Sequence, residues 1–244
     1  MALKPDSPEQ SHSERDEYFI SMTDMMVGMI FLFIIMLMFF ALKFETATSK
    51  TEALVKSFES SEEVRDSILT KIKKDMASRG YVVQVNPIRG ALSLPENLLF
   101  ERGRSELAPL GVAAIGELGQ VLYTDLLCYT GTGINQSEQP CTPNSQAIEA
   151  VLIEGHTDSD GDFNANWDLS VKRSFATYRS LLAASPQLDH LVNKEGQPIF
   201  SIAGFGRQRP IAPNDSIENK ARNRRVDIRL IMLPPKSSEL GAHP

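Results

Sequence analysis

The chain has 244 residues, a formal net charge of −6 at pH 7, and a composition that is 42% hydrophobic and 23% charged. This length suits one ordinary domain with some additional elements, and the acidic balance argues against a protein that binds nucleic acid. Because the composition as a whole is that of a globular protein, any membrane segment must be recognised from a local run of apolar residues.

The N-terminal region combines a polar tail with a long apolar run. Residues 1–17 are polar and acidic, which predicts a disordered tail. Met25–Leu42 contains neither a charged residue nor proline, and as a helix these 18 residues would extend roughly 27 Å, close to the thickness of a bilayer core. No basic region precedes the run and no small-residue cleavage site follows it, as a signal peptide would require. Since the run is apolar all round, a transmembrane helix over residues 19–44 is favoured over a buried core helix.

One acid, Asp24, stands at the N-terminal edge of this run. A carboxylate inside a bilayer costs roughly 2.5–3.5 kcal/mol on insertion scales, and less near the interface. A lone acid without a basic partner nearby is suited to binding and releasing protons. An acid near the interface could instead cap the helix N-terminus, where the helix macrodipole favours a negative charge. Position alone leaves both interpretations open.

Residues 45–79 contain neither glycine nor proline, so the helix is expected to continue as a linker. A narrow apolar stripe recurs there mostly at intervals of four residues, formed by Leu54, Phe58, Val64, Ile68, Ile72 and Met76. Such a stripe suits either a partner helix, for example a second copy of the chain in a coiled coil, or packing against the chain's own domain. Gly80 fits the position just after a helix C-terminus.

Residues 80–233 alternate between the two kinds of secondary structure. Strands are predicted at Tyr81–Val85, Ala91–Leu94, Ala150–Glu154, Ile199–Gly204 and Arg225–Leu233, and helices at Pro109–Leu127, Asn166–Ala184 and Ser216–Arg222. The pattern predicts an α/β sandwich with a mixed sheet. The residues expected to face the core are Ile115, Leu118 and Leu122 in the first helix and Phe175, Tyr178, Leu181 and Leu182 in the second. Residues 234–244 are expected to form a tail.

The two cysteines of the chain, Cys128 and Cys141, both lie within a polar insertion over residues 128–146. A disulfide between them would close this loop and would indicate an oxidising compartment for the C-terminal domain. Two unrelated free thiols are the alternative.

The stretch 154–173 is rich in polar side chains, and three interpretations compete for it. Its alternating acids suggest a calcium loop, but Phe163 and Leu169 stand where an EF-hand needs glycine and glutamate. His156 could act as a catalytic base, but no serine or cysteine in a nucleophile-elbow context accompanies it. The third interpretation is a binding site. Asp158 could bind an ammonium group while Arg173 binds a carboxylate, so that together they hold a zwitterion. Spacing alone also allows a structural salt bridge.

Four motifs in this region resemble those of OmpA-like peptidoglycan-binding domains. They are Gly155-His156-Thr157-Asp158; Asn166, Leu169, Ser170 and Arg173; Gly204-Phe205-Gly206 with Pro210; and Asn223-Arg224-Arg225-Val226. The resemblance covers about Leu94–Leu233 and implies that Asp158 and Arg173 hold the diaminopimelate of the stem peptide. It also assigns Asn166, Leu169 and Arg224 to the peptidoglycan-binding site. Ala165, where many members have tyrosine, is a departure.

The segment Met22–Phe33 resembles the helix of MotB-type stator subunits, whose equivalent aspartate, here Asp24, carries the coupling ion. The resemblance implies a homodimer bound to a multi-span, MotA-like A-type membrane subunit in five copies. It also implies a cytoplasmic N-terminus over residues 1–18, a single pass through the inner membrane and a periplasmic domain.

Within this class, the chain is most similar to the B-type subunits of Zorya anti-phage defence systems. The similarity lies in the apolar sequence of the helix, the cysteine-bearing insertion and the helical linker. A flagellar-type stator subunit and a cell-wall tether without ion transport are the alternatives. No enzymatic activity, cofactor, metal or nucleic-acid partner is expected.

Overall fold

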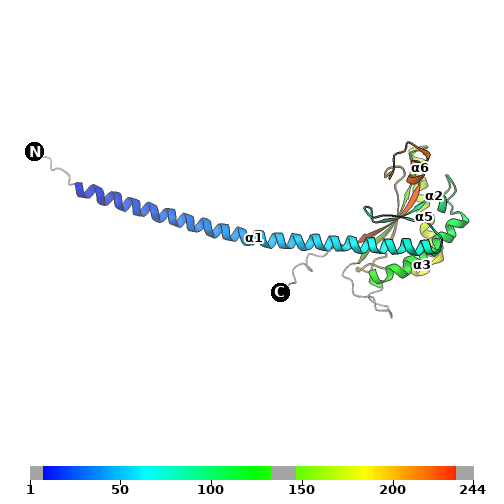
Figure 1. Ribbon diagram of the computed structural model, residues 1–244, viewed down its shortest axis with the longest axis horizontal. Coiled ribbons are helices and arrows are strands. Elements are labelled where there is room, and N and C mark those ends of the chain that lie inside the picture. Colours follow the sequence, from blue (N-terminus) through cyan, green and yellow to red (C-terminus); the bar gives the residue numbers. More distant parts are fainter. Residues whose placement is uncertain (1–7, 133–146, 235–244) are drawn as a thin grey trace, which may run out of the picture. The chain divides into compact units, whose positions relative to one another are not determined.

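The computed structural model of the protein describes residues 8–132 and 147–234 (Figure 1). Its long helix, α1 (Pro8–Ser78), supplies the first of two compact units as far as Lys56 and enters the second unit at Ser57. The helix begins at Pro8, well before residue 19, so the expectation of a disordered tail over residues 1–17 is wrong from Pro8 onward. Proline is favoured in the first turn of a helix, because the N–H group that it lacks would have no partner there.

Within the first unit, none of the described residues covers the apolar part of α1. Large apolar side chains from Met22 to Phe44 are exposed on every side of the helix, and its best 18-residue window has a mean hydropathy of 2.8. Among the described helices, α3 (Pro109–Leu126) is also long and apolar enough to cross a bilayer, but its apolar window is half buried in the second unit. The first unit therefore presents the uncovered, membrane-length helix that the sequence predicts.

The second unit is built on a five-stranded mixed sheet with strand order β1-β2-β5-β3-β4. Strands β3 and β4 are parallel and the other neighbours are antiparallel. The strands are β1 (Gln84–Asn86), β2 (Ala91–Pro95), β3 (Ile148–His156), β4 (Phe200–Gly204) and β5 (Arg225–Met232). The predicted α/β class with a mixed sheet is confirmed.

Within the described residues, three helices and two short 3-10 helices accompany α1 and α3 in this unit. They are α2 (Glu96–Leu99), α5 (Phe163–Ala184), α6 (Ile217–Asn223), η1 (Leu127–Tyr129) and η2 (Pro186–His190). Helix α5 packs on β3, β4 and α3, and α2 packs on α3. The sequence did not predict α2, which has a single turn and follows β2 directly.

The last part of α1 belongs to the core of the second unit. Ile68, Ile72 and Met76 are all buried there, with Val64 packed against them. Lys71 also donates to Asp125 of α3 at 2.5 Å. Of the two alternatives for the apolar stripe, packing on the chain's own domain therefore holds for its second half.

Helix α5 turns a largely polar face inward. Leu181 is buried as predicted, and Tyr178 and Leu182 are partly buried against the core. Phe175 was also expected to face the core, but it is 47% exposed. The buried positions along the helix are Asn166, Ser170, Arg173, Ser174, Thr177 and Leu181. Because this stripe is mostly polar, hydrophobic periodicity finds its C-terminal part at Leu181 but misses the buried polar positions before it. The three inward residues predicted for α3 are all buried.

Candidate ligand-binding site

The site forms where α5 lies directly on the carboxyl end of β3. A Cβ atom at Gly155 would stand 2.0 Å from the carbonyl oxygen of Ser170, so only glycine allows this approach. The loop after β3 then enters α5 through Asp162, whose side chain accepts the backbone N–H groups of Asn164 and Ala165 at 2.9 and 3.0 Å. This packing brings Asp158, in the loop, and Arg173, on the buried face of α5, to the same end of the sheet.

A chain of alternating charges connects these two residues. Arg224 donates through Nη1 to Asp158 Oδ2 at 2.6 Å and through Nε to Glu96 Oε2 at 2.5 Å. The other oxygen of Glu96 accepts a hydrogen bond from Arg173 Nη2. The order is therefore Asp158, Arg224, Glu96, Arg173, with each charge next to its opposite.

Arg173 is the most firmly held member of this network. Its side chain is 1% exposed, its Nε donates to the carbonyl of Arg104 at 2.9 Å, and its guanidinium lies 5.1 Å from the centre of the Phe100 ring. A buried guanidinium with these contacts is stable only because the Glu96 carboxylate balances its charge.

The structure brings three of the predicted site residues into one network, but not as a direct pair. Asp158 and Arg173 are joined only through Arg224 and Glu96. Asn166 is buried and donates to the carbonyl of Asp160 at 2.7 Å, and Leu169 is half-buried. Glu96 was missed, although a lone glutamate in the apolar stretch 91–100 was a signal that could have indicated a functional acid.

The acids that suggested a calcium loop have other partners. Asp160 pairs with Lys220 at 2.6 Å, and this hydrogen bond lowers the pKa of the exposed carboxyl. Asp162 caps α5, and the N–H groups it accepts likewise lower its pKa. At Arg224, burial opposes the charged form, but Asp158 and Glu96 outweigh it and raise the pKa of the guanidinium.

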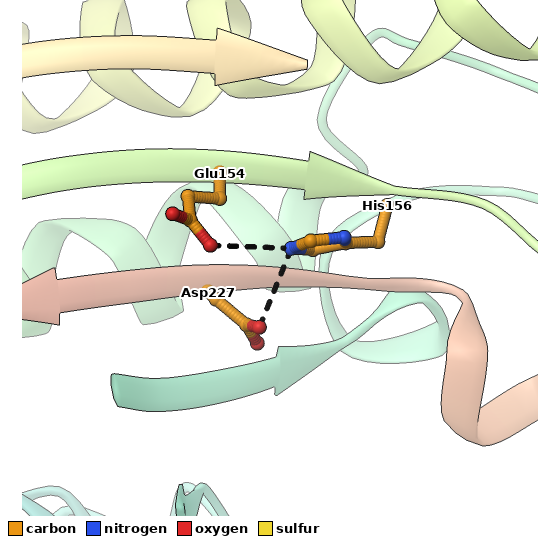
Figure 2. A group of neighbouring side chains, drawn as sticks. All are labelled: Glu154, His156 and Asp227. Atoms are coloured by element: carbon orange, nitrogen blue, oxygen red, sulfur yellow. Dashed lines mark ion pairs between the residues drawn. The ribbon is translucent and has the colours of Figure 1, made fainter. Parts of the chain in front are cut away.

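A second polar cluster is formed by Glu154 and His156 of β3 and Asp227 of the neighbouring strand β5, and all three residues are buried (Figure 2). Nε2 of His156 lies 3.5 Å from Glu154 Oε2 and 3.4 Å from Asp227 Oδ2. Arg229 donates to Glu154 at 2.8 Å, and Arg225 donates to Asp227 at 2.9 Å. Because two guanidinium groups already balance the two carboxylates, a divalent cation would add charge that nothing offsets. The cluster is therefore a poor metal site.

This cluster makes the stability of the domain depend on pH. Burial would raise the pKa of Glu154 and of Asp227, but His156 and the neighbouring guanidinium groups outweigh it and lower both pKa values. A carboxyl whose pKa is lower in the folded state stabilises the fold above its unfolded pKa of about 4 and loses that contribution as the pH falls.

We therefore expect the free energy of unfolding to fall as the pH drops below about 4.5. Chemical denaturation at a series of pH values measures it. In Asp227→Asn, which has one such carboxyl fewer, the drop should be smaller. Asp189→Asn, which removes an exposed carboxyl in η2, should leave the drop unchanged. A stability that stays level down to pH 3 in the wild type would contradict this assignment.

Comparison with known proteins finds similarity over part of the chain. Residues 138–224, about a third of the chain, match the model of the OmpA family. Motility protein B of Bacillus subtilis is 34% identical over 93 residues, which cover 36% of this chain and 32% of that protein. Probable lipoprotein YiaD of Escherichia coli is 27% identical over 160 residues, 66% of this chain and 59% of that protein. Motility protein B of Helicobacter pylori (strain ATCC 700392 / 26695) is 25% identical over 174 residues, which cover 70% of this chain and 57% of that protein.

These matches support the OmpA-like, MotB-type resemblance that the motifs indicated. The chain matches between about a third and three fifths of the length of these relatives. The predicted Cys128–Cys141 bond involves Cys141, which lies outside the described residues, so the pairing stays a prediction.

Proposed function

We propose that this protein is a B-type stator subunit that anchors an ion-driven motor of the inner membrane to peptidoglycan. The observation that carries the proposal is the combination, in one chain, of an uncovered apolar helix containing a single acid and an OmpA-like domain with a buried charge network. The similarity to two motility proteins B supports the same class.

In the proposed domain function, the charge network recognises the free end of diaminopimelate. Asp158 binds the ammonium group and Arg173 binds the carboxylate, because opposite charges in a largely buried site give strong, directional hydrogen bonds. Asn166, Leu169 and Arg224 line the same site. An ammonium and a carboxylate on one carbon are found at this diamino acid and not on the glycan strands, so the network would select the stem peptide.

In the proposed membrane function, Asp24 relays the coupling ion, a proton. The helix over residues 19–44 would cross the inner membrane once, with the N-terminus in the cytoplasm and the domain in the periplasm, where a disulfide between Cys128 and Cys141 is chemically reasonable. Two copies of the chain would sit inside a ring of five MotA-like A-type subunits. A wall-bound domain would hold the helices still while the ring turns around them.

Within this class we favour a role in anti-phage defence. The residues DMMVGMIFLF, the cysteine-bearing insertion and the helix straight after the span resemble ZorB, the B-type subunit of the Zorya system. A flagellar stator subunit is the second candidate, because two of the relatives are motility proteins B. A wall tether without ion transport is the third, and the likeness to a probable lipoprotein favours it.

Binding of the full-length chain to isolated peptidoglycan tests the domain function. Asp158→Asn keeps the shape of the side chain but removes its charge, and we expect it to weaken binding roughly tenfold to hundredfold, the usual worth of a hydrogen bond to a charged group. Asp189→Asn removes an exposed carboxyl in η2 and should bind like the wild type. Equal binding of Asp158→Asn and the wild type would remove the basis of the proposed site.

A further inference from the structure

The two residues assigned to the wall ligand are both occupied from within the chain. Arg224 donates a hydrogen bond to the Asp158 carboxylate at 2.6 Å, and Glu96 accepts one from the Arg173 guanidinium. Asp158 and Arg173 are also buried. A ligand therefore cannot reach either charge while these contacts last.

The occupants have the chemistry of the ligand itself. A zwitterion offers one cationic and one anionic group, and Arg224 and Glu96 offer the same two charges, joined to each other at 2.5 Å. We infer that the Glu96–Arg224 pair is an internal competitor that holds the site closed, and that a zwitterionic wall ligand binds by displacing it. This inference rests on the proposed wall-binding function and adds a regulatory step to the same site.

The competitor is the half of the network that can move. Arg173 is fixed by Phe100 and by the carbonyl of Arg104, whereas the Arg224 side chain is 17% exposed. Glu96 is the first residue of the four-residue helix α2, and its side chain is 8% exposed.

There is also space for the pair to move into. Glu96 and Arg224 both line a pocket of about 270 Å³, whose other lining residues include Ser93, Asn97 and Arg222. The pair can turn into this space without unfolding of the sheet. Only molecules in the open state bind the ligand. The apparent affinity is therefore the intrinsic affinity multiplied by the fraction of molecules that are open.

A variant that removes the charge of Glu96 distinguishes competition with the ligand from simple support of the site, because the two roles change the ligand affinity in opposite directions. Glu96→Gln keeps the shape and one acceptor oxygen but leaves Arg173 without its anion. If Glu96 competes with the ligand, this variant binds the ligand more tightly. If Glu96 only positions Arg173, the variant binds more weakly.

The experiment titrates the full-length, detergent-solubilised chain with free meso-diaminopimelic acid. We expect Glu96→Gln to bind roughly tenfold more tightly than the wild type, the equivalent of one lost hydrogen bond between charged groups. Glu106→Gln, at an exposed glutamate outside the network, should match the wild type. Binding by Glu96→Gln that equals or falls below that of the wild type, in a protein that is still folded at the temperature of the titration, overturns the inference.

Hydrogen exchange on the wild type gives a second readout that needs no variant. The Glu96 amide donates to the Arg224 carbonyl at 3.0 Å, and the Phe100 amide donates to the Glu96 carbonyl at 2.7 Å. Saturation with the same probe should speed exchange of both amides while it slows exchange around Asp158. Slower or unchanged exchange at both amides in the ligand-bound state overturns the competitor. Absence of binding by every variant, to the probe and to peptidoglycan, would instead overturn the proposed wall-binding function.

Discussion

Asp24→Asn is expected to abolish ion-driven activity while leaving peptidoglycan binding unchanged. Asp24 is the one acid between residues 18 and 44, so no other carboxylate in the span could take over the proton. Each proton that crosses 100 mV supplies about 2.3 kcal/mol, and an asparagine cannot capture that energy. Protection of cells against phage, measured as plating efficiency with the A-type partner present, is the readout.

Two variants control this experiment. Met25→Leu changes the neighbouring residue without changing charge and should protect like the wild type. Asp24→Glu keeps a carboxylate at a slightly different depth and should retain part of the activity. If Asp24→Asn cells resist phage as well as wild-type cells, the motor function is wrong and the tether interpretation replaces it.

Arg173→Met is expected to damage both the fold and the binding of peptidoglycan. The change leaves Glu96 buried with one of its two guanidinium partners gone, and removing one member of a buried ion pair typically costs about 3–5 kcal/mol. Chemical denaturation measures this loss, and the pull-down on peptidoglycan measures binding. Arg179→Met, on the exposed side of the same helix beside Phe175, should cost less than about 1 kcal/mol.

A double variant separates the two effects. Glu96→Gln with Arg173→Met removes both members of the pair, so part of the lost stability should return, because no buried charge is then left uncompensated. Binding of peptidoglycan should stay weak. If the double variant is less stable than Arg173→Met alone, Arg173 does not compensate the buried charge of Glu96.

The sequence predicted β2 to β5 and the long helices well, because alternating and helical hydrophobic patterns mark them directly, but β1 begins at Gln84 rather than at Tyr81. β3, α3 and β5 lie within a few residues of their expected bounds. The inward face of α5 was predicted less well, because polar side chains such as Ser174 and Thr177 occupy positions that a hydrophobic pattern assigns to solvent.

Hydrophobic periodicity also failed to predict the element at the centre of the candidate site. Helix α2 has four residues, which is too short for any periodic signal, so Glu96 was not seen as a member of the site. The motifs around Asp158 and Arg173 indicated both residues. However, their sequence separation could not reveal that Arg224 and Glu96 stand between them. That arrangement depends on β2 and β5 pairing side by side, a contact between segments more than 120 positions apart.

The apolar stripe on α1 shows a different limit. A stripe of this width is the same whether it meets a second copy of the chain or the chain's own sheet, so its partner is decided by tertiary packing. The structure buries Ile72 and Met76 in the domain core, while Phe58 remains 50% exposed.

In the proposed function the domain recognises a zwitterion through Asp158 and Arg173, and competition between small molecules tests this recognition most directly. The full-length chain is bound to isolated peptidoglycan and challenged with meso-diaminopimelic acid, with pimelic acid, which has only the two carboxylates, or with cadaverine, which has only the two amines. We expect that meso-diaminopimelic acid alone releases the protein and that Asp158→Asn loses this response. Release by pimelic acid or cadaverine at the same concentration, or no release by any of the three, would contradict it.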